Sequence, residues 1–407
     1  MTKRLVTLSV IALLGVTALP YTARADDPGV FKIPGTDSTI KFNGFAETAL
    51  FYEFSGGYES LAGACDYYIC PQGIALTSLA NGGATPHTNT PQMAMTSAYS
   101  RFGLQTNTPS AVGNIGMRFE MDAAEGYQDI GASFTHHGSI RLRHAYGTVG
   151  DTVLIGQTWT TFADLNTFPD QMDENPLVNL AALRAPMFRV TFPAGPTKIS
   201  IAIEDPYNRS FAQTHFSIPD VIARIDIPAS YGSFSIRGVT TQYANDSQSK
   251  QGFGGAIGAA INFAGDSLVL DVEGGSGIGT YQYGLTAGPP VSEDAVAVGT
   301  TDIKLWTTVG GSIGYTHVWT PQFRSNLMGS ILITSGDGDL RTALDAATPG
   351  AYEQANRSVA TGGFNTYWSV SKTFWTGPEF YVDYRKNFEG DSGTEFRGEW
   401  VGHFNLF

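Results

Sequence analysis

Residues 140–146 constrain the fold of this chain more than any other stretch. Large apolar side chains alternate there with Arg141 and Arg143, which is the period of a β-strand with one apolar face. If such a strand crosses a membrane as part of a barrel, both arginines must face the lumen, because an arginine on the lipid side costs about 2–4 kcal/mol at the bilayer midplane. This penalty predicts the register of the strand. The long loop expected at 161–183 is then a candidate to fold into the pore.

The first residues predict export from the cytoplasm. A basic start, an apolar run and an A-x-A motif at 23–25 make residues 1–25 a secretory signal peptide, cleaved after export through the Sec pathway. The mature chain is expected to begin at Asp26. The formal net charge is −13, and cleavage removes three cationic residues. Nucleic acid is therefore not an expected partner.

The composition of the mature chain favours a barrel over other secreted folds. No apolar run after the signal approaches the roughly 18 residues that a transmembrane helix needs. The chain has 48 Gly, 25 Phe, 18 Tyr and 6 Trp, whereas only 15% of its residues are charged. Together with the export signal, this balance is typical of an outer-membrane β-barrel. A secreted β-sandwich or β-helix is the alternative.

Strand and turn signals alternate along the mature chain and predict sixteen strands. These cover 38–52, 100–107, 114–122, 140–146, 152–159, 185–192, 198–204, 221–227, 233–243, 252–263, 267–283, 302–320, 323–334, 361–375, 379–388 and 395–407. Short turns follow the even-numbered strands and longer loops follow most odd ones, as in barrels with periplasmic turns and external loops. Sixteen strands would enclose an aqueous channel; fourteen and eighteen are the alternatives. We expect one antiparallel transmembrane barrel over 38–407, preceded by a short periplasmic segment at 26–37.

The predicted register gathers arginines on the lumen face of strands 2 to 8. They are Arg101, Arg118, Arg141, Arg143, Arg189 and Arg224. An inward-folded loop at 161–183 would set acidic groups across from them. Its candidate constriction residues are Phe162, Asp164, Asp170, Asp173 and Glu174. The transverse field would orient a charged solute, and guanidinium groups bind carboxylates bidentately, so this wall favours small carboxylates. Alternatively, the arginines pair with lumen acids such as Glu120 and Asp226 and only keep the pore wet.

Four sequence segments resemble the DcaP-like outer-membrane porins. They read FKIPGTDS at 31–38, SRFG at 100–103, IRLRHAYG at 140–147 and GQTWTTFAD at 156–164. The resemblance covers the first six strands well and the remainder only in pattern. It implies a trimeric barrel that passes small solutes, dicarboxylates among them, by diffusion. Members of this family often carry a helical periplasmic extension, for which the dozen or so residues before the first strand leave no room.

The ends and loops suggest further features and partners. Cys65 and Cys70 lie in one loop rich in Gly and Tyr, so a local disulfide is expected in an exported protein. Phe407 is terminal, as expected for recognition by the barrel-assembly machinery, although it does not share a face with the outward residues of the last strand, which a bulge would reconcile. The other expected partners are outer-membrane lipid and lipopolysaccharide, further copies of this chain in a trimer, and small anionic solutes.

Three motifs that could carry other chemistry are discounted. The G-x-S-x-G match at 310–314 lies inside an alternating strand and not at a strand–turn–helix elbow. The acidic segment 335–339 lacks the downstream acidic ligand of a calcium loop and is expected to be a flexible loop. Adjacent histidines at 136–137 would point to opposite faces of a strand. No metal or cofactor is predicted.

The combined pattern predicts a non-enzymatic outer-membrane porin that lets ions and small solutes diffuse, with a preference for small anions such as carboxylates. A barrel lipase or protease is the first alternative. It would need a Ser/His or Asp/His pair at the barrel rim, and none stands out among the seven histidines. A structural or adhesive barrel with a plugged lumen is the second alternative.

Overall fold

The computed structural model describes most of the predicted barrel. The described residues are 29–55, 74, 76, 91–125, 139–173, 177–181, 183–205, 218–245, 247–285, 294–298, 302–347 and 349–407. The predicted signal peptide at 1–25, the cysteine pair Cys65 and Cys70, the histidines at 136–137 and the loop residue Glu174 lie outside these ranges.

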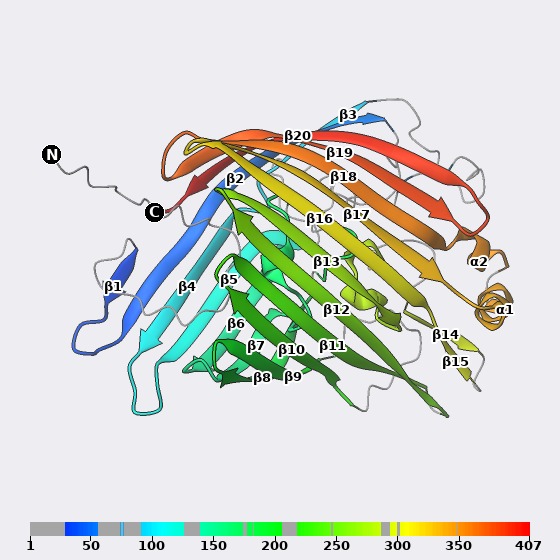
Figure 1. Cartoon of the computed structure of the whole chain (residues 1–407), viewed down its shortest axis with the longest axis horizontal. Helices are drawn as coiled ribbons and strands as arrows, with labels where there is room; N and C mark the ends of the chain where they lie inside the picture. Colours follow the sequence, from blue (N-terminus) through cyan, green and yellow to red (C-terminus); the bar gives the residue numbers. More distant parts are fainter. Residues whose placement is uncertain are drawn as a thin grey trace.

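One antiparallel sheet closes on itself to form a barrel (Figure 1). Its strands are β1 (Val30–Lys32), β2 (Thr39–Ser55), β3 (Gln92–Thr96), β4 (Arg101–Thr108), β5 (Ile115–Glu125), β6 (Ser139–Val149), β7 (Val153–Trp159), β8 (Arg184–Ala194), β9 (Thr197–Glu204), β10 (Asp220–Ala229), β11 (Gly232–Ala244), β12 (Ser249–Phe263), β13 (Asp266–Ser276), β16 (Thr307–Thr320), β17 (Phe323–Ser335), β18 (Asn356–Ser369), β19 (Phe374–Asn387) and β20 (Ser392–Asn405). The last strand pairs with the first long one, with Asn405 opposite Phe45. Closure leaves no unpaired edge, which is what a sheet in hydrocarbon requires.

Among the described residues the ring has sixteen strand positions, as the sequence predicted. Short β1 pairs only with the first residues of β2. Strand β3 pairs with residues 49–53 of β2 and strand β4 with residues 39–45, so the two together occupy one strand position in the ring. A sixteen-stranded ring is wide enough to enclose a lumen.

The two ends of the barrel differ. Tight turns close the hairpins at one end, for example between β8 and β9 and between β12 and β13. The other end carries the hairpin of β14 (Ala295–Val298) and β15 (Asp302–Leu305) together with helices α1 (Gly338–Ala347) and α2 (Ala351–Gln354), on the side away from β1 and the C-terminus (Figure 1). No helix in the described ranges is long and apolar enough to cross a membrane.

Side chains alternate between the lumen and the outer face as predicted. In β9, Ile199, Ile201 and Ile203 are exposed on the outside, whereas Ala202 and Glu204 are buried inside. The same sorting holds in β5, where the apolar residues point outward and the charged ones inward. An outward apolar belt is the arrangement that a bilayer stabilises.

The predicted turn at 376–378 is wrong. These residues belong to β19, and the chain turns at 370–373 instead, where the N–H of Ser371 donates to the carbonyl of Phe374 at 3.1 Å. Pro378 is tolerated because the pairing of β18 with β19 is interrupted beside it. The shift also places Trp375 on the lumen side, packed on Tyr367.

Three further segments differ from the prediction. The strand expected at 302–320 breaks at Trp306, and the strand expected to reach 283 ends at Ser276. The segment expected to be a flexible loop at 335–339 starts helix α1, because the Asp337 carboxylate accepts from the backbone N–H of Leu340 at 2.8 Å. At the C-terminus the last strand ends at 405, so the final aromatic residue is outside the strand and needs no bulge.

Candidate functional site: the lumen and its inner loop

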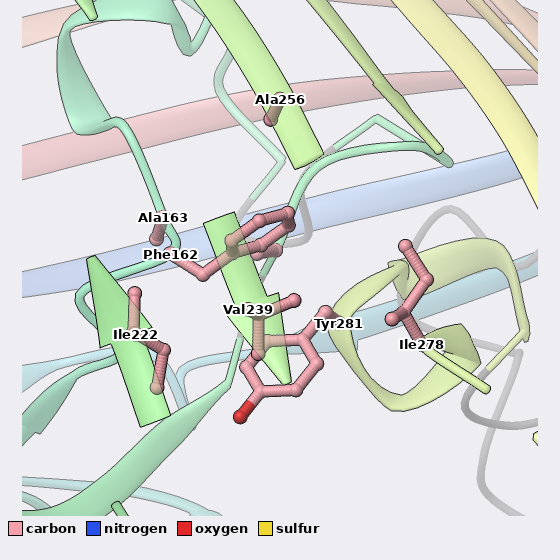
Figure 2. Close-up of a cluster of buried hydrophobic side chains, with 8 residues drawn as sticks. Phe162, Ala163, Ile222, Val239, Ala256, Ile278 and Tyr281 are labelled. Atoms are coloured by element: carbon pink, nitrogen blue, oxygen red, sulfur yellow. The ribbon is translucent and has the colours of Figure 1, made fainter. Parts of the chain in front are cut away.

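Between β7 and β8 the described residues 160–173, 177–181 and 183 lie inside the barrel, and they are called the inner loop below. The backbone N–H of Thr161 donates to the buried carboxylate of Glu204 on β9 at 2.7 Å. The side chain of the next residue, Phe162, is fully buried among side chains of β10, β11 and β12. Figure 2 shows it beside Tyr281 of the 3-10 turn η3 (Gly279–Tyr281), and the two ring centroids are 5.4 Å apart. The predicted inward folding of this loop is confirmed.

Asp164 is an anchor of the inner loop and is paired with the wall. Its carboxylate accepts from the Arg224 guanidinium of β10 at 3.0 Å. The same guanidinium donates to the Ala163 carbonyl at 2.5 Å and to Asp226 at 2.6 Å. Two carboxylates therefore neutralise Arg224, which pairs with Asp226 as the alternative expected and also holds the loop in place.

The far end of the inner loop is anchored on the opposite side of the barrel. Asp170 forms an ion pair with Arg324 of β17. The backbone N–H groups of Met172 and Asp173 donate to the fully buried Glu379 carboxylate of β19 at 3.0 and 2.7 Å. The loop therefore spans from β9 to β19 and occupies that half of the lumen wall. Asp164 and Asp170 therefore anchor the inner loop to the wall through ion pairs.

Glycines on the inner face of the wall make room for the inner loop. The positions are Gly258 on β12, Gly310 and Gly314 on β16, and Gly377 on β19. At each of them an added Cβ would come within 3.0 Å of an inner-loop side chain, for example 2.8 Å from Cβ of Pro169 at position 314. The discounted G-x-S-x-G match thus has a structural explanation, because its glycines let the loop approach the backbone.

The half of the wall that the inner loop leaves uncovered carries clustered arginines, called the basic sector below (the lumen arginines of β4 to β8). Arg141 donates to both oxygens of Asp122, at 2.9 and 2.7 Å. Arg143 bridges the acids of β5, with 2.9 Å to Glu120 and 2.7 Å to Asp122. These two arginines face the lumen as predicted and are paired as the alternative expected.

A β-bulge in β6 shifts the predicted alternation by one residue. Glu120 lies opposite His144, but Met121 lies opposite Leu142, so Arg143 is the extra residue. Arg143 and His144 consequently both point inward and are buried. Tyr146, expected on the lipid side, follows the same shift to the lumen, opposite the inward Arg118.

The remaining arginines of the basic sector differ in their compensation. Arg118 pairs with Glu120 at 2.7 Å, and Arg101 lies over the ring of Phe45 at 5.1 Å. Within the described ranges, no carboxylate oxygen lies within 4.0 Å of the guanidinium of Arg184 or Arg189.

Arg184 is the functional candidate that sequence reasoning missed. Its guanidinium lies over the Trp159 ring, 3.6 Å from the centroid, and its Nε is buried without a hydrogen-bond partner. It was missed because it lies between the predicted loop and the predicted strand, where the alternation of side chains along a strand does not predict which way its side chain points. Arg237 of β11 also points inward; it donates to the carbonyl of Phe162 at 2.7 Å and thus holds the loop.

Buried acids line the wall beneath the far end of the inner loop. They include Glu379, Asp383, Glu395 and Glu399 on β19 and β20. Arg397 pairs with Glu395 at 2.7 Å. No group of His, Cys, Asp and Glu in the described ranges is placed to hold a metal ion. The lumen is therefore polarised, with basic side chains on β4 to β8 and acidic ones on β19 and β20.

Comparison with known proteins identifies the architecture. Neither protein-family models nor curated sequences match this chain. The outer membrane channel DcaP of Acinetobacter baumannii superposes with a TM-score of 0.74 at 22% identity, covering 92% of this chain and 99% of that one. The fold is that of an outer-membrane porin. OmpT of Vibrio cholerae (TM-score 0.57, 7% identity, 93% and 100% covered) and OmpF of Salmonella typhi in complex with daunomycin (0.51, 10%, 91% and 98%) share this porin fold. The resemblance to DcaP-like porins is thus confirmed for the fold.

Proposed function

We propose that this chain is a porin of the bacterial outer membrane through which small solutes diffuse passively, with a preference for small anions such as carboxylates. The observation that carries the anion preference is the basic sector, in which Arg184 and Arg189 have no carboxylate oxygen within 4.0 Å among the described residues. The closed barrel, its apolar outer belt and the likeness to outer-membrane channels support the membrane location.

The geometry of the basic sector suits carboxylate recognition. A guanidinium presents two parallel donors to a carboxylate, and stacking on Trp159 holds the Arg184 group in one plane. The paired arginines beside it, Arg141 and Arg143, add a positive wall whose charge is partly cancelled by Asp122 and Glu120. A dicarboxylate would engage two arginines at once, whereas a cation would meet repulsion at the same level.

The selectivity test uses purified protein in a planar bilayer under a salt gradient. We expect discrete conductance steps and a reversal potential that favours anions. Arg184→Gln with Arg189→Gln should reduce the anion preference, whereas Lys372→Gln, which removes a cation from a turn, is the matched control. Cation preference in the wild type would refute the anion claim and leave the porin, and the absence of any conductance would refute both.

An outer-membrane hydrolase is a second candidate, favoured by one observation at the rim. On the outer face near the tight turns, His317 contacts Asp266 at 2.9 Å, and Ser325 lies opposite His317 in the ladder. The Ser325 hydroxyl instead bonds Trp319 at 3.0 Å and Thr366 at 2.8 Å, so nucleophile and base are not joined. Phospholipid or peptide hydrolysis that is lost in His317→Ala would establish this function; its absence leaves the porin.

Trimer assembly and recognition of Phe407 by the barrel-assembly machinery are part of the proposal. Trimers are supported by the likeness to a trimer form of Vibrio cholerae OmpT, with a TM-score of 0.50. Phe407 lies beyond the last strand and is half exposed, so its side chain is accessible. Mass measurement of the protein in detergent tests the first point, and membrane insertion of Phe407→Ser the second.

A further inference from the structure

Two cationic side chains lie next to each other on the outer face of the barrel, at the end that carries α1 and α2. Lys386 of β19 is opposite Ser358 of β18, and a β-bulge inserts Arg357 beside this pair. Lys386 continues the outward series of Val382 and Tyr384. The exposed Arg357 is on the same face, because both residues of a bulge oppose one partner.

This pair of cations is uncompensated in an acidic protein. Within the described part of the chain, no carboxylate oxygen lies within 4.0 Å of the Arg357 or Lys386 nitrogens. The nearby Glu353 of α2 is paired with Arg341 instead. Arg357 is exposed and Lys386 is half-buried, so in a chain of formal net charge −13 both are accessible to an external anion.

The height of the two cations matches the level of lipid headgroups. Lys386 lies opposite Ser358, ten positions along β18 from the outward Trp368, which is exposed near the tight turns. At about 3.3 Å per residue and a strand tilt near 40°, this separation corresponds to about 25 Å along the barrel axis. The apolar band of such barrels is about 25 Å tall. The cations therefore lie just above its outer edge.

The wall directly below the cations has small side chains. Gly329, Ala360 and Gly362 are outward neighbours on β17 and β18. A Cβ at Gly362 would meet only a backbone oxygen at 4.0 Å, so the surface there is open. Ile331 and Tyr384 flank this strip and are 47% and 36% exposed. An acyl chain can lie along such a strip while its headgroup contacts the cations.

We propose that Arg357 and Lys386 bind a phosphate of lipid A in the outer leaflet, with an acyl chain along the strip at Gly329, Ala360 and Gly362. This inference rests on the proposed outer-membrane location, but not on conduction. Lipid A is the phosphorylated lipid that this leaflet supplies at the loop end of a barrel, whereas free phosphate would not use the apolar strip below.

The test measures lipid binding by the folded barrel in detergent. Diphosphoryl lipid A should bind about tenfold more tightly than dephosphorylated lipid A. Arg357→Ser with Lys386→Ser should abolish this difference, whereas Arg357→Lys with Lys386→Arg should keep it. Lys372→Ser, which removes a cation from the turn of the same hairpin, should bind as the wild type does. Heat-modifiable gel mobility confirms that each variant is folded.

Three results would overturn the proposal: equal binding of both lipid A forms, unchanged binding by the double Ser variant, or equal preference for phosphatidylglycerol or inorganic phosphate. Conductance of the same samples separates the two proposals. Lost lipid discrimination with intact conductance refutes only the lipid site, whereas lipid A binding without conductance refutes only the porin.

Discussion

Adding one methyl group at Gly314 should displace the inner loop from the barrel wall. The new Cβ would lie 2.8 Å from Cβ of Pro169 and 2.9 Å from Val269. Carbon atoms in contact prefer about 3.5–4.0 Å, so roughly 1 Å must be taken up. The Val269 side chain can rotate, but the rigid ring of Pro169 cannot. Overpacking of this kind costs about 1–3 kcal/mol.

Because the strained contact is lost when the loop leaves the wall, Gly314→Ala should raise the undocked population about 5- to 150-fold. Single-channel recordings should show more frequent openings to a larger conductance. Gly311→Ala is the matched control on the same strand, since its Cβ would face outward and meet only ordinary contacts at 3.4 and 3.6 Å. If Gly314→Ala gave the same recordings as the wild type, or if Gly311→Ala had an equal effect, the inner loop would not be docked against the backbone at Gly314.

Three further predictions follow from the site and its surroundings. Asp122→Ala removes the buried carboxylate that Arg141 and Arg143 share, so thermal melting should reveal a loss of about 3–5 kcal/mol, while reversal potentials shift further toward anions; a shift toward cations would contradict the assignment. For an ion that passes at an assumed distance of about 7 Å, the Arg184 charge attracts an anion and repels a cation by about 0.6 kcal/mol each in water, so Arg184→Gln should lower the anion-to-cation permeability ratio about sevenfold; an unchanged ratio would leave Arg184 with a structural role only. Trp306 packs beneath α1 and α2 and stacks on Tyr352 and Phe388 with 5.7 Å between ring centroids. Trp306→Ala should therefore cost about 3–5 kcal/mol locally and expose α1 to protease without unfolding the barrel. Unfolding of the whole barrel would contradict this expectation.

The barrel could be predicted because the bilayer imposes a simple rule on side chains. Each strand crosses from one interface to the other, so a period of two is maintained over many residues, as in the isoleucines of β9. The rule fails where the backbone adds a residue. The bulge at Arg143 leaves no mark in a sequence that continues to alternate, and it moved His144 and Tyr146 to the lumen.

The turn between β18 and β19 was misplaced for a related reason. The Thr-Gly-Pro run at 376–378 has the residue types of a turn, but Gly377 is required by close approach: an added Cβ would lie 2.0 Å from the Thr366 carbonyl oxygen and 2.8 Å from Met172 of the inner loop. A contact between residues two hundred positions apart is not visible in local sequence. The actual turn uses Ser371 and Thr373.

The arginines of the lumen were largely predictable, but their partners were not. Period-two patterning placed Arg141 and Arg143 inside without information about the facing strand. Their neutralisation by Asp122 depends on the register between β5 and β6, which only the fold determines. The same holds for Arg224, whose partner Asp164 lies sixty residues away on the inner loop.

The reversal potential of single wild-type channels under a tenfold KCl gradient tests the central claim most directly. If Arg184 and Arg189 of the basic sector act on ions in an open lumen, the potential must have the sign of an anion-preferring pore, and it must move toward zero in the double Gln variant. A potential of the opposite sign, or one that the two substitutions leave unchanged, would contradict this account.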